Sequence, residues 1–209
     1  MRIKEKIRYL KRTEINNLQS FINSNYSRSH ILSTNKKLIH FYYNYKKKNN
    51  LSILGYFNDN KLLGIAGIIR QDNWEKKPSK NYFLSLLVKD KSLKKEITFS
   101  FFNFIYTKIK PNLFVCSGFN KNIKKVYKKI GKIAKFSHFY IYNDKFKNGL
   151  SKNLNKISIK EKDKINNIKI EETISLIKTP YSKYNPAKSK IYFINKYIKN
   201  PFYKYTFLN

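Results

Sequence analysis

Apolar residues recur along much of the chain at i, i+3 or i+4 and i+7, the spacing that predicts amphipathic helices. Four such stretches precede residue 145: Thr13–Ser24, Asn35–Lys46, Leu93–Ile109 and Asn120–Ile130. Thr13 is the expected N-cap of the first helix. Pro111 follows the third helix and Gly131 follows the fourth, as expected of residues that end helices.

Short apolar runs between these helices predict strands. They are Ile3–Leu10, Leu51–Phe57, Lys61–Ile69, Tyr82–Val88, Leu113–Ser117 and Phe136–Tyr142. Asn58, Asp59 and Asn60 tolerate turn geometry and indicate a β-hairpin, while Gly64 and Gly67 indicate close backbone approach or a bend. Strands and helices alternate in the later half, which implies parallel crossovers beside an antiparallel hairpin. We therefore predict an α/β fold with a mixed sheet and helices on both faces.

The distribution of polar residues divides the chain further. We expect three segments: an α/β domain over residues 1–145, a Lys/Asn/Glu-rich connector over 146–180, and a C-terminal appendage over 181–209. Ser189–Lys199 is helix-like and Phe202–Leu208 is strand-like. This order of elements echoes Asn35–Phe57, so a partial second repeat is the alternative interpretation of the last segment.

The net charge is +33, which favours partners such as nucleic acid or other polyanions. The excess comes from lysine, however, since the arginines are only Arg2, Arg8, Arg12, Arg28 and Arg70. Lys, Asn, Ile, Tyr and Phe are all abundant and all have A/T-rich codons. We therefore favour codon bias over a nucleic-acid-binding role, which stays the alternative.

Location and redox state follow from what the sequence lacks. No run of 18 apolar residues predicts a membrane span, and no signal-peptide pattern follows Met1. Cys116 is the single cysteine and has no disulfide partner within the chain. No His/Cys cluster has the spacing of a zinc site, so we expect no metal. We expect a cytoplasmic protein.

One segment resembles a known family. Cys116–Asn120, followed by Val126–Gly131, looks like the strand–loop–helix signature of the GNAT superfamily of N-acetyltransferases, in which an Asn opens the helix and a Tyr-x-x-apolar-Gly run closes it. The resemblance covers Ile3 to Tyr142. The segments His30–Leu32 and Asn200–Tyr205 are similar to a branch common among surface-polysaccharide gene products.

This resemblance implies an acyltransferase with acetyl-CoA as donor and an amine acceptor, such as an amino-sugar in surface polysaccharide synthesis. Acetyl-CoA would lie between the strands at 82–88 and 113–117, where backbone amides of Leu87 and Val88 would polarise the thioester carbonyl. Tyr127 matches the superfamily's tyrosine that protonates the leaving thiolate. Its alternative interpretation is a core aromatic residue, because it lies in an apolar stripe.

The resemblance also implies that the CoA pyrophosphate binds at the start of the long helix. The residues expected there are Lys91, Ser92, Lys94 and Lys95, with Asn120 at the start of the next helix. The stretch 91–96 has no glycine, unlike the superfamily's loop, and Glu96 would repel phosphate. A catalytically degenerate remnant of the fold is therefore the alternative.

The general base is sought among few carboxylates. Asp72 and Glu75 flank Trp74 in the loop that would border the acceptor cleft in this architecture. A solvated surface loop is the favoured interpretation of both. Three histidines are further candidates in principle: His30, His40 and His138.

Overall fold

The computed structural model describes residues 5–45, 49–93, 97–117, 124–133, 170–171, 188–205 and 207–208. The chain forms two units, one of Met1–Ser117 with Glu171–Phe207 and the other of Gly118–Ile170 with Leu208–Asn209. The first unit holds the main sheet. In the second, helix α4 (Lys124–Ile130) is the longest element that is described. The predicted connector lies almost wholly outside the described residues.

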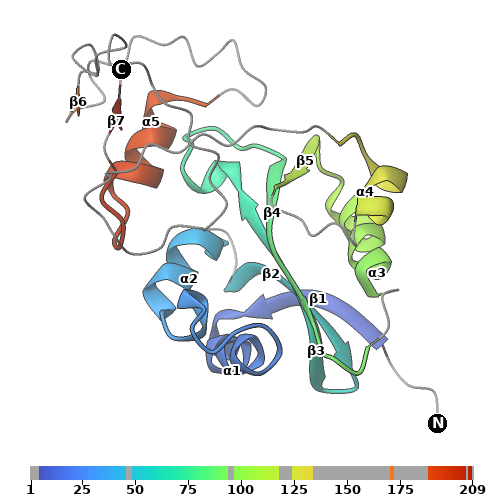
Figure 1. Cartoon of the computed structure of the whole chain (residues 1–209). Helices are drawn as coiled ribbons and strands as arrows, with labels where there is room; N and C mark the ends of the chain where they lie inside the picture. Colours follow the sequence, from blue (N-terminus) through green and yellow to red (C-terminus); the bar gives the residue numbers. More distant parts are fainter. Residues whose placement is uncertain are drawn as a thin grey trace, which may run out of the picture. The chain divides into compact units, whose positions relative to one another are not determined.

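A five-stranded mixed sheet forms the centre of the first unit (Figure 1). Its strands are β1 (Glu5–Lys11), β2 (Asn50–Asn58), β3 (Lys61–Arg70), β4 (Asn81–Lys89) and β5 (Leu113–Cys116), in this spatial order. Neighbours from β1 to β4 are antiparallel, and β4 and β5 are parallel. The predicted mixed α/β sheet is thereby confirmed. The predicted strand Phe136–Tyr142 lies outside the described residues.

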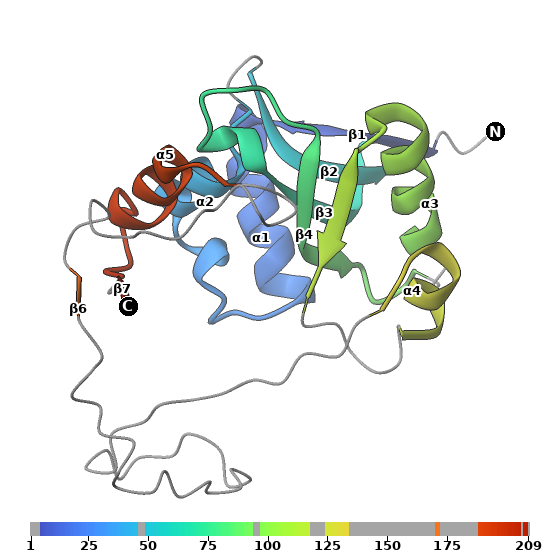
Figure 2. The same ribbon diagram turned by 90° about the horizontal axis from the view of Figure 1, so that it is seen from above.

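Helices pack on both faces of this sheet, as predicted (Figure 2). Helices α1 (Ile15–Asn25) and α2 (Lys36–Tyr43) cover one face. Helix α3 (Ile97–Phe104), extended by the π-helical turn η4 (Ile105–Ile109), covers the other. The predicted start of this helix at Leu93 is wrong. Leu93 lies in a turn, and its backbone N–H donates to the Asp90 carbonyl.

Two glycines of β3 show how closely the layers approach. A Cβ atom on Gly64 would lie 3.0 Å from Ile97 of α3, and one on Gly67 would lie 2.9 Å from the Tyr43 ring of α2. The two glycines therefore face opposite sides of the sheet. The close approach expected at both positions is confirmed, and it explains why β3 contains residues that are otherwise unfavourable in strands.

The buried face of α2 differs from the apolar stripe that the spacing predicts, which consists of Leu38, Phe41, Tyr42 and Tyr45. Ile39 and Tyr43 are buried against the sheet with Leu38, whereas Phe41 and Tyr42 are half-buried. The ring centroids of Phe41 and Tyr42 each lie 5.9 Å from that of Trp74. The helix thus carries two apolar faces because it packs against the sheet on one side and an aromatic cluster on another.

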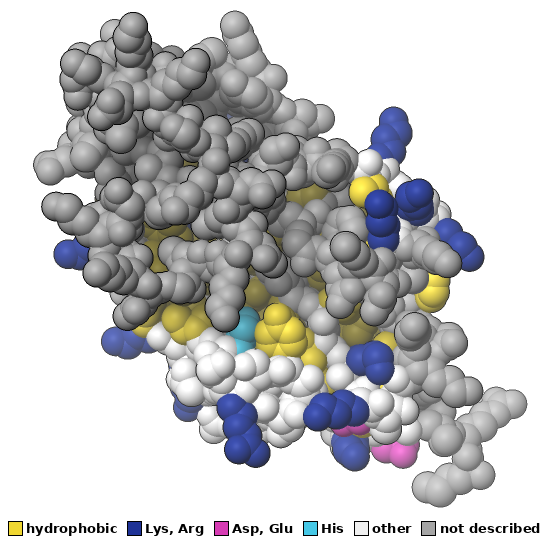
Figure 3. Space-filling model, viewed as in Figure 1, with side chains coloured by type: hydrophobic (Ala, Val, Ile, Leu, Met, Phe, Trp, Pro, Cys, Tyr) yellow, Lys and Arg dark blue, Asp and Glu magenta, His cyan; other side chains and the backbone are white. Residues whose placement is uncertain are grey.

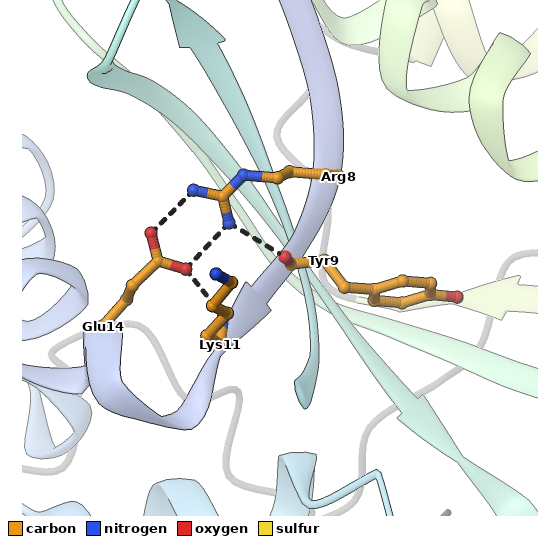
Figure 4. Close-up of polar contacts among 4 residues, drawn as sticks. All are labelled: Arg8, Tyr9, Lys11 and Glu14. Carbon is orange, nitrogen blue, oxygen red and sulfur yellow. Dashed lines mark hydrogen bonds and ion pairs between the residues drawn. The ribbon is translucent and has the colours of Figure 1, made fainter. Parts of the chain in front are cut away.

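The start of α1 is stabilised by Glu14 and not by Thr13, so the predicted N-cap is wrong (Figure 4). A short 3-10 turn, η1 (Arg12–Glu14), precedes the helix and moves its first residue to Ile15. The Glu14 carboxylate accepts hydrogen bonds from both Arg8 guanidinium nitrogens, at 2.8 and 2.7 Å, and from the Lys11 amide at 2.7 Å. These bonds lower the pKa of Glu14, chiefly through Arg8.

We expect Glu14→Gln to lower the free energy of unfolding by about 1 kcal/mol at pH 7, a value reduced because both side chains are partly exposed. The lowered pKa means that this stability is present above the unfolded-state pKa and is lost as the pH falls through the folded-state pKa. Urea denaturation at a series of pH values measures the difference between variant and wild type. A difference that persists unchanged at pH 2 would contradict the assignment.

The C-terminal segment contains the predicted helix but only part of the predicted strand. Helix α5 (Lys190–Phe193) continues as the π-helical turn η9 (Ile194–Ile198). Residues 202–205 are not a strand, because the Asn200 side-chain oxygen accepts hydrogen bonds from the Phe202 and Tyr203 amides and turns the chain. Among the described residues of the predicted strand, only Phe207 and Leu208 form one, β7 (Phe207–Leu208). It pairs with β6 (Ile170–Glu171).

Candidate functional site

Strand β4 contains a β-bulge at Ser85. Gly67 and Ile68 are consecutive on β3, yet they pair with Leu86 and Leu84 on β4, so Ser85 is the additional residue. The Ser85 hydroxyl donates to the Gly67 carbonyl at 3.1 Å and lies 2.8 Å from the Tyr43 hydroxyl. Because a bulge bends its strand and increases the local twist, the two halves of β4 point in different directions.

Pairing between β4 and β5 ends where this bulge begins. The register runs from Asn81 opposite Leu113 to Leu84 opposite Cys116, and β4 then continues to Lys89 with only β3 as its described neighbour. Successive backbone amides of a strand point to alternate edges. One N–H of the pair Leu87 and Val88 therefore points away from β3, toward the side that β5 has left.

A cavity of about 240 Å³ lies on the sheet immediately before the bulge. Phe83 and Val115 form its floor and are paired with each other, one position before the last β4–β5 pair. Trp74 and Tyr192 form an aromatic wall, with ring centroids 5.8 Å apart. This volume is below the roughly 300–1,000 Å³ of drug-sized pockets, so the cavity suits a small molecule.

Lys188, Tyr192 and Lys196 line one side of the cavity. Their segment, residues 188–200, lies beside α2 and beside the loop that follows β3 (Figures 1 and 2). The Asn195 side-chain amide donates to the Trp74 backbone carbonyl at 3.1 Å, and the Asn200 side-chain amide donates to the Tyr42 hydroxyl at 3.2 Å. The Ser189 amide and hydroxyl both donate to the Glu75 carboxylate. The cavity therefore exists only when these distant parts of the chain are packed together.

Two lysines lie at this wall. The Lys196 Nζ lies 5.2 Å from the ring centroids of Trp74 and Tyr192 and donates to the Tyr192 hydroxyl at 2.8 Å. The Lys188 Nζ lies 5.3 Å from the Tyr192 centroid. Burial, with the repulsion of Lys188, lowers the pKa of Lys196 to about 8. At pH 7 the charged form of Lys196 therefore still predominates.

The predicted bases have structural partners. The Asp72 carboxylate accepts two hydrogen bonds from Arg70, at 2.9 and 2.6 Å, while Glu75 binds Ser189 as described above. Neither carboxylate lines the cavity beside Val115. His30 accepts a hydrogen bond from the Leu32 amide at the start of a turn, and His40 is exposed on α2. His138 lies outside the described residues.

The predicted CoA-binding residues are only partly described. Lys91 and Ser92 are exposed in a turn after β4, where the Asp90 carboxylate accepts hydrogen bonds from the Ser92 amide and hydroxyl at 2.9 and 2.6 Å. Lys94, Lys95 and Asn120 lie outside the described residues. Tyr127 lies in α4 and is therefore part of the second unit, which is described by itself.

On the face shown in Figure 3, Lys and Arg side chains are scattered over the surface. No described helix combines the length and apolar character needed to cross a bilayer. Nor do the described residues contain three or more His, Cys, Asp or Glu side chains arranged to hold a metal ion.

The sequence interpretation missed the cavity and its two lysines. Lys188, Tyr192 and Lys196 follow one another at i, i+4 and i+8, a spacing that places them on one helical face. This shared helical face could have been recognised in the sequence. The spacing does not indicate which part of the chain the face contacts, because Trp74 is more than a hundred residues away.

Comparisons with known proteins give matches to solved structures alone. No family model matches the sequence, and no curated protein matches it significantly. The chain is similar to an aminoglycoside N-acetyltransferase, AAC(6')-Iy, in complex with a CoA bisubstrate analogue, with 12% identity and a TM-score of 0.49 over 67% of this chain and 99% of that one.

Two further structures are similar at the same level. A ribosomal-protein-alanine N-acetyltransferase from Brucella melitensis has 12% identity and a TM-score of 0.45, covering 67% of this chain and 99% of that one. A GNAT family acetyltransferase from Staphylococcus aureus has 14% identity and a TM-score of 0.41, covering 68% and 100%. Because these sequence identities and TM-scores are low, the proposed function rests on the strands and side chains of this chain.

Proposed function

We propose that the chain is an acyl-CoA-dependent N-acyltransferase of the GNAT type, with acetyl-CoA as donor. The observation that carries this proposal is the coincidence of the Ser85 bulge with the end of β4–β5 pairing. The downstream half of β4 keeps an edge without a described strand partner, and backbone amides at such an edge are available to a ligand. A thioester is a ligand that such amides suit, since its carbonyl gains negative charge during reaction.

The proposed chemistry combines the free edge of β4 with the role that the sequence resemblance implies for Tyr127. A neutral amine attacks the thioester carbonyl carbon, and the oxyanion that forms accepts a hydrogen bond from an amide near Leu87 or Val88. The carbon–sulfur bond then breaks, the amide product forms, and the CoA thiolate leaves. In this proposal Tyr127 donates a proton to the thiolate. The attacking nitrogen releases one proton to solvent, and the Tyr127 phenolate takes up one proton from solvent, so charge and atoms balance.

The cavity beside Phe83 and Val115 is the proposed acceptor site. It lies on the sheet next to the last paired position of β4 and β5, upstream of Leu87 and Val88 on the same strand. Its small volume and aromatic wall suit a ring-shaped acceptor. An amino-sugar used in surface polysaccharide synthesis fits this description, and we place the reaction in the cytoplasm, where acetyl-CoA is available.

The direct test is release of free CoA thiol from acetyl-CoA in the presence of amines, with acetyl-CoA binding measured separately by calorimetry. We expect both binding and amine-dependent thiol release. Binding without release for any amine would indicate a degenerate relative. Absence of binding at submillimolar acetyl-CoA would overturn the proposed function.

We expect Tyr127→Phe to lower kcat by about 100-fold, the lower end of the range for general acid catalysis, without changing thermal stability. Steady-state thiol release measures this effect. Tyr26→Phe is the matched control, because Tyr26 is 58% exposed after α1 and has no proposed role. A Tyr127→Phe rate equal to that of wild type would remove Tyr127 as the acid.

A further inference from the structure

Two ammonium groups lie near the same aromatic ring at one end of the proposed acceptor cavity. The ammonium groups of Lys188 and Lys196 both lie within 5.3 Å of the Tyr192 ring centroid. Their mutual repulsion contributes to the lowered pKa of Lys196. Two cations held near the same ring are unfavourable unless a negative charge is placed beside them.

No described carboxylate forms an ion pair with either lysine. The ion pairs formed within the described ranges are Arg8 with Glu14 and Arg70 with Asp72. The Glu75 carboxylate binds Ser189 and lies near enough to Tyr192 to help raise the pKa of its hydroxyl. The described lining of the cavity likewise contains no Asp or Glu. Such a lining would disfavour an acceptor with several ammonium groups.

Lys196 also retains hydrogen-bonding capacity toward the cavity. An ammonium group has three N–H donors, and contacts among the described residues use one of them, to the Tyr192 hydroxyl. Trp74 attracts the lysine through its ring, and the hydrogen bond to the Tyr192 hydroxyl holds it in place. Lys196 is therefore a positioned donor at the wall, and Phe83 and Val115 lie at the floor next to the bulge.

From this arrangement we infer that the acceptor is an amine that also carries an anionic group, a carboxylate or a phosphate, bound by Lys188 and Lys196. The inference rests on the proposed acyltransferase function. The anion occupies the lysine end of the cavity, and the amine then lies toward the β4–β5 end, on the side of the Ser85 bulge. The two lysines thus select the acceptor and orient it.

Matched pairs of amines test the inference. Glucosamine 6-phosphate is compared with glucosamine, and tyrosine with tyramine, so that one pair tests phosphate and the other carboxylate. With acetyl-CoA as donor, we expect the anionic member of at least one pair to have a kcat/KM at least about tenfold higher, consistent with charge-assisted hydrogen bonds. The pair that shows this preference identifies the anion.

The variant Lys196→Met removes the charge and keeps an unbranched side chain. We expect it to lower kcat/KM for the anionic acceptor about tenfold, mainly by raising KM, and to lower kcat/KM for the neutral acceptor much less. Lys196→Arg should retain most of the preference. Lys199→Met is the matched control, because Lys199 is exposed on the same segment and its removal changes the net charge equally. It should behave like wild type.

A second readout does not depend on acyl transfer. Trp74 is the single tryptophan of the chain and lines the cavity, so its fluorescence reports occupancy directly. The anionic amines should change this fluorescence in wild type and Lys199→Met at concentrations at which Lys196→Met does not respond.

The outcomes separate this inference from the proposed function. If acetyl-CoA binds and reacts but neutral and anionic amines are used equally, the inference is overturned and the proposed function stands. If acetyl-CoA does not bind, the proposed function fails, and the fluorescence titration alone decides: a response lost in Lys196→Met supports the anion site, and equal responses overturn it.

Discussion

Replacing Trp74 with alanine is expected to lower the free energy of unfolding by about 3–5 kcal/mol. The side chain is 3% exposed and its ring contacts the rings of Phe41, Tyr42 and Tyr192. The substitution removes the surface that joins α2 to the C-terminal segment and leaves a large void between them. It also removes the aromatic wall, so KM for the acceptor should rise. Urea denaturation followed by circular dichroism measures the loss of stability.

Trp74→Phe is the control for this effect, because it retains an aromatic ring at the same position and should recover most of the stability. A cost of less than about 1 kcal/mol for Trp74→Ala would contradict the packing described here, since exposed positions typically change stability by no more than about 0.5 kcal/mol.

The second large effect is expected for Gly67→Val. A Cβ atom at this position would lie 2.9 Å from the Tyr43 ring and 3.2 Å from the Leu86 Cβ, which is fixed to the neighbouring strand. Tyr43 would have to move, and its hydrogen bond to the bulge residue Ser85 would break. We expect a loss of about 1–3 kcal/mol from overpacking. Acyl transfer should fall as well, because the bulge directs the downstream half of β4.

The matched glycine is Gly131, where an added Cβ would meet nothing within 4 Å. Gly131→Ala should leave both the free energy of unfolding and thiol release close to wild type. If Gly67→Val were equally neutral, the tight contact between β3 and Tyr43 would be refuted. If it lowered stability but not kcat, the bulge would have a structural role alone.

Most of the sheet could be predicted because its strands are short, apolar and separated by clear turn residues. Asn58, Asp59 and Asn60 indicated the hairpin, and Asp59 indeed adopts a positive φ of 52°. Element ends were less predictable. Thr13 has the right side chain for an N-cap, but the choice between Thr13 and Glu14 depends on the long-range position of Arg8, which sequence periodicity does not contain.

The candidate site was predicted unevenly for a related reason. Leu87 and Val88 were placed at the edge of β4 by resemblance to a family, and the bulge at Ser85 had no sequence signal beyond an isolated serine in an apolar strand. Lys196 falls in the predicted C-terminal appendage, because nothing in the sequence indicates its contact with the ring of Trp74. Side-chain clusters assembled from distant segments leave no periodic pattern in the sequence.

This assembly determines when the cavity forms during folding. Strands β1 to β4 pair in sequential order, and the β1–β2 pairing, from Lys11 to Asn50, closes a segment of 39 positions. The acceptor cavity instead requires contacts between residues 114, 121 and 158 positions apart. Closing such long loops costs more chain entropy and is slower. We expect a refolding intermediate that already protects sheet amides from hydrogen exchange while Trp74 is still accessible to a soluble quencher.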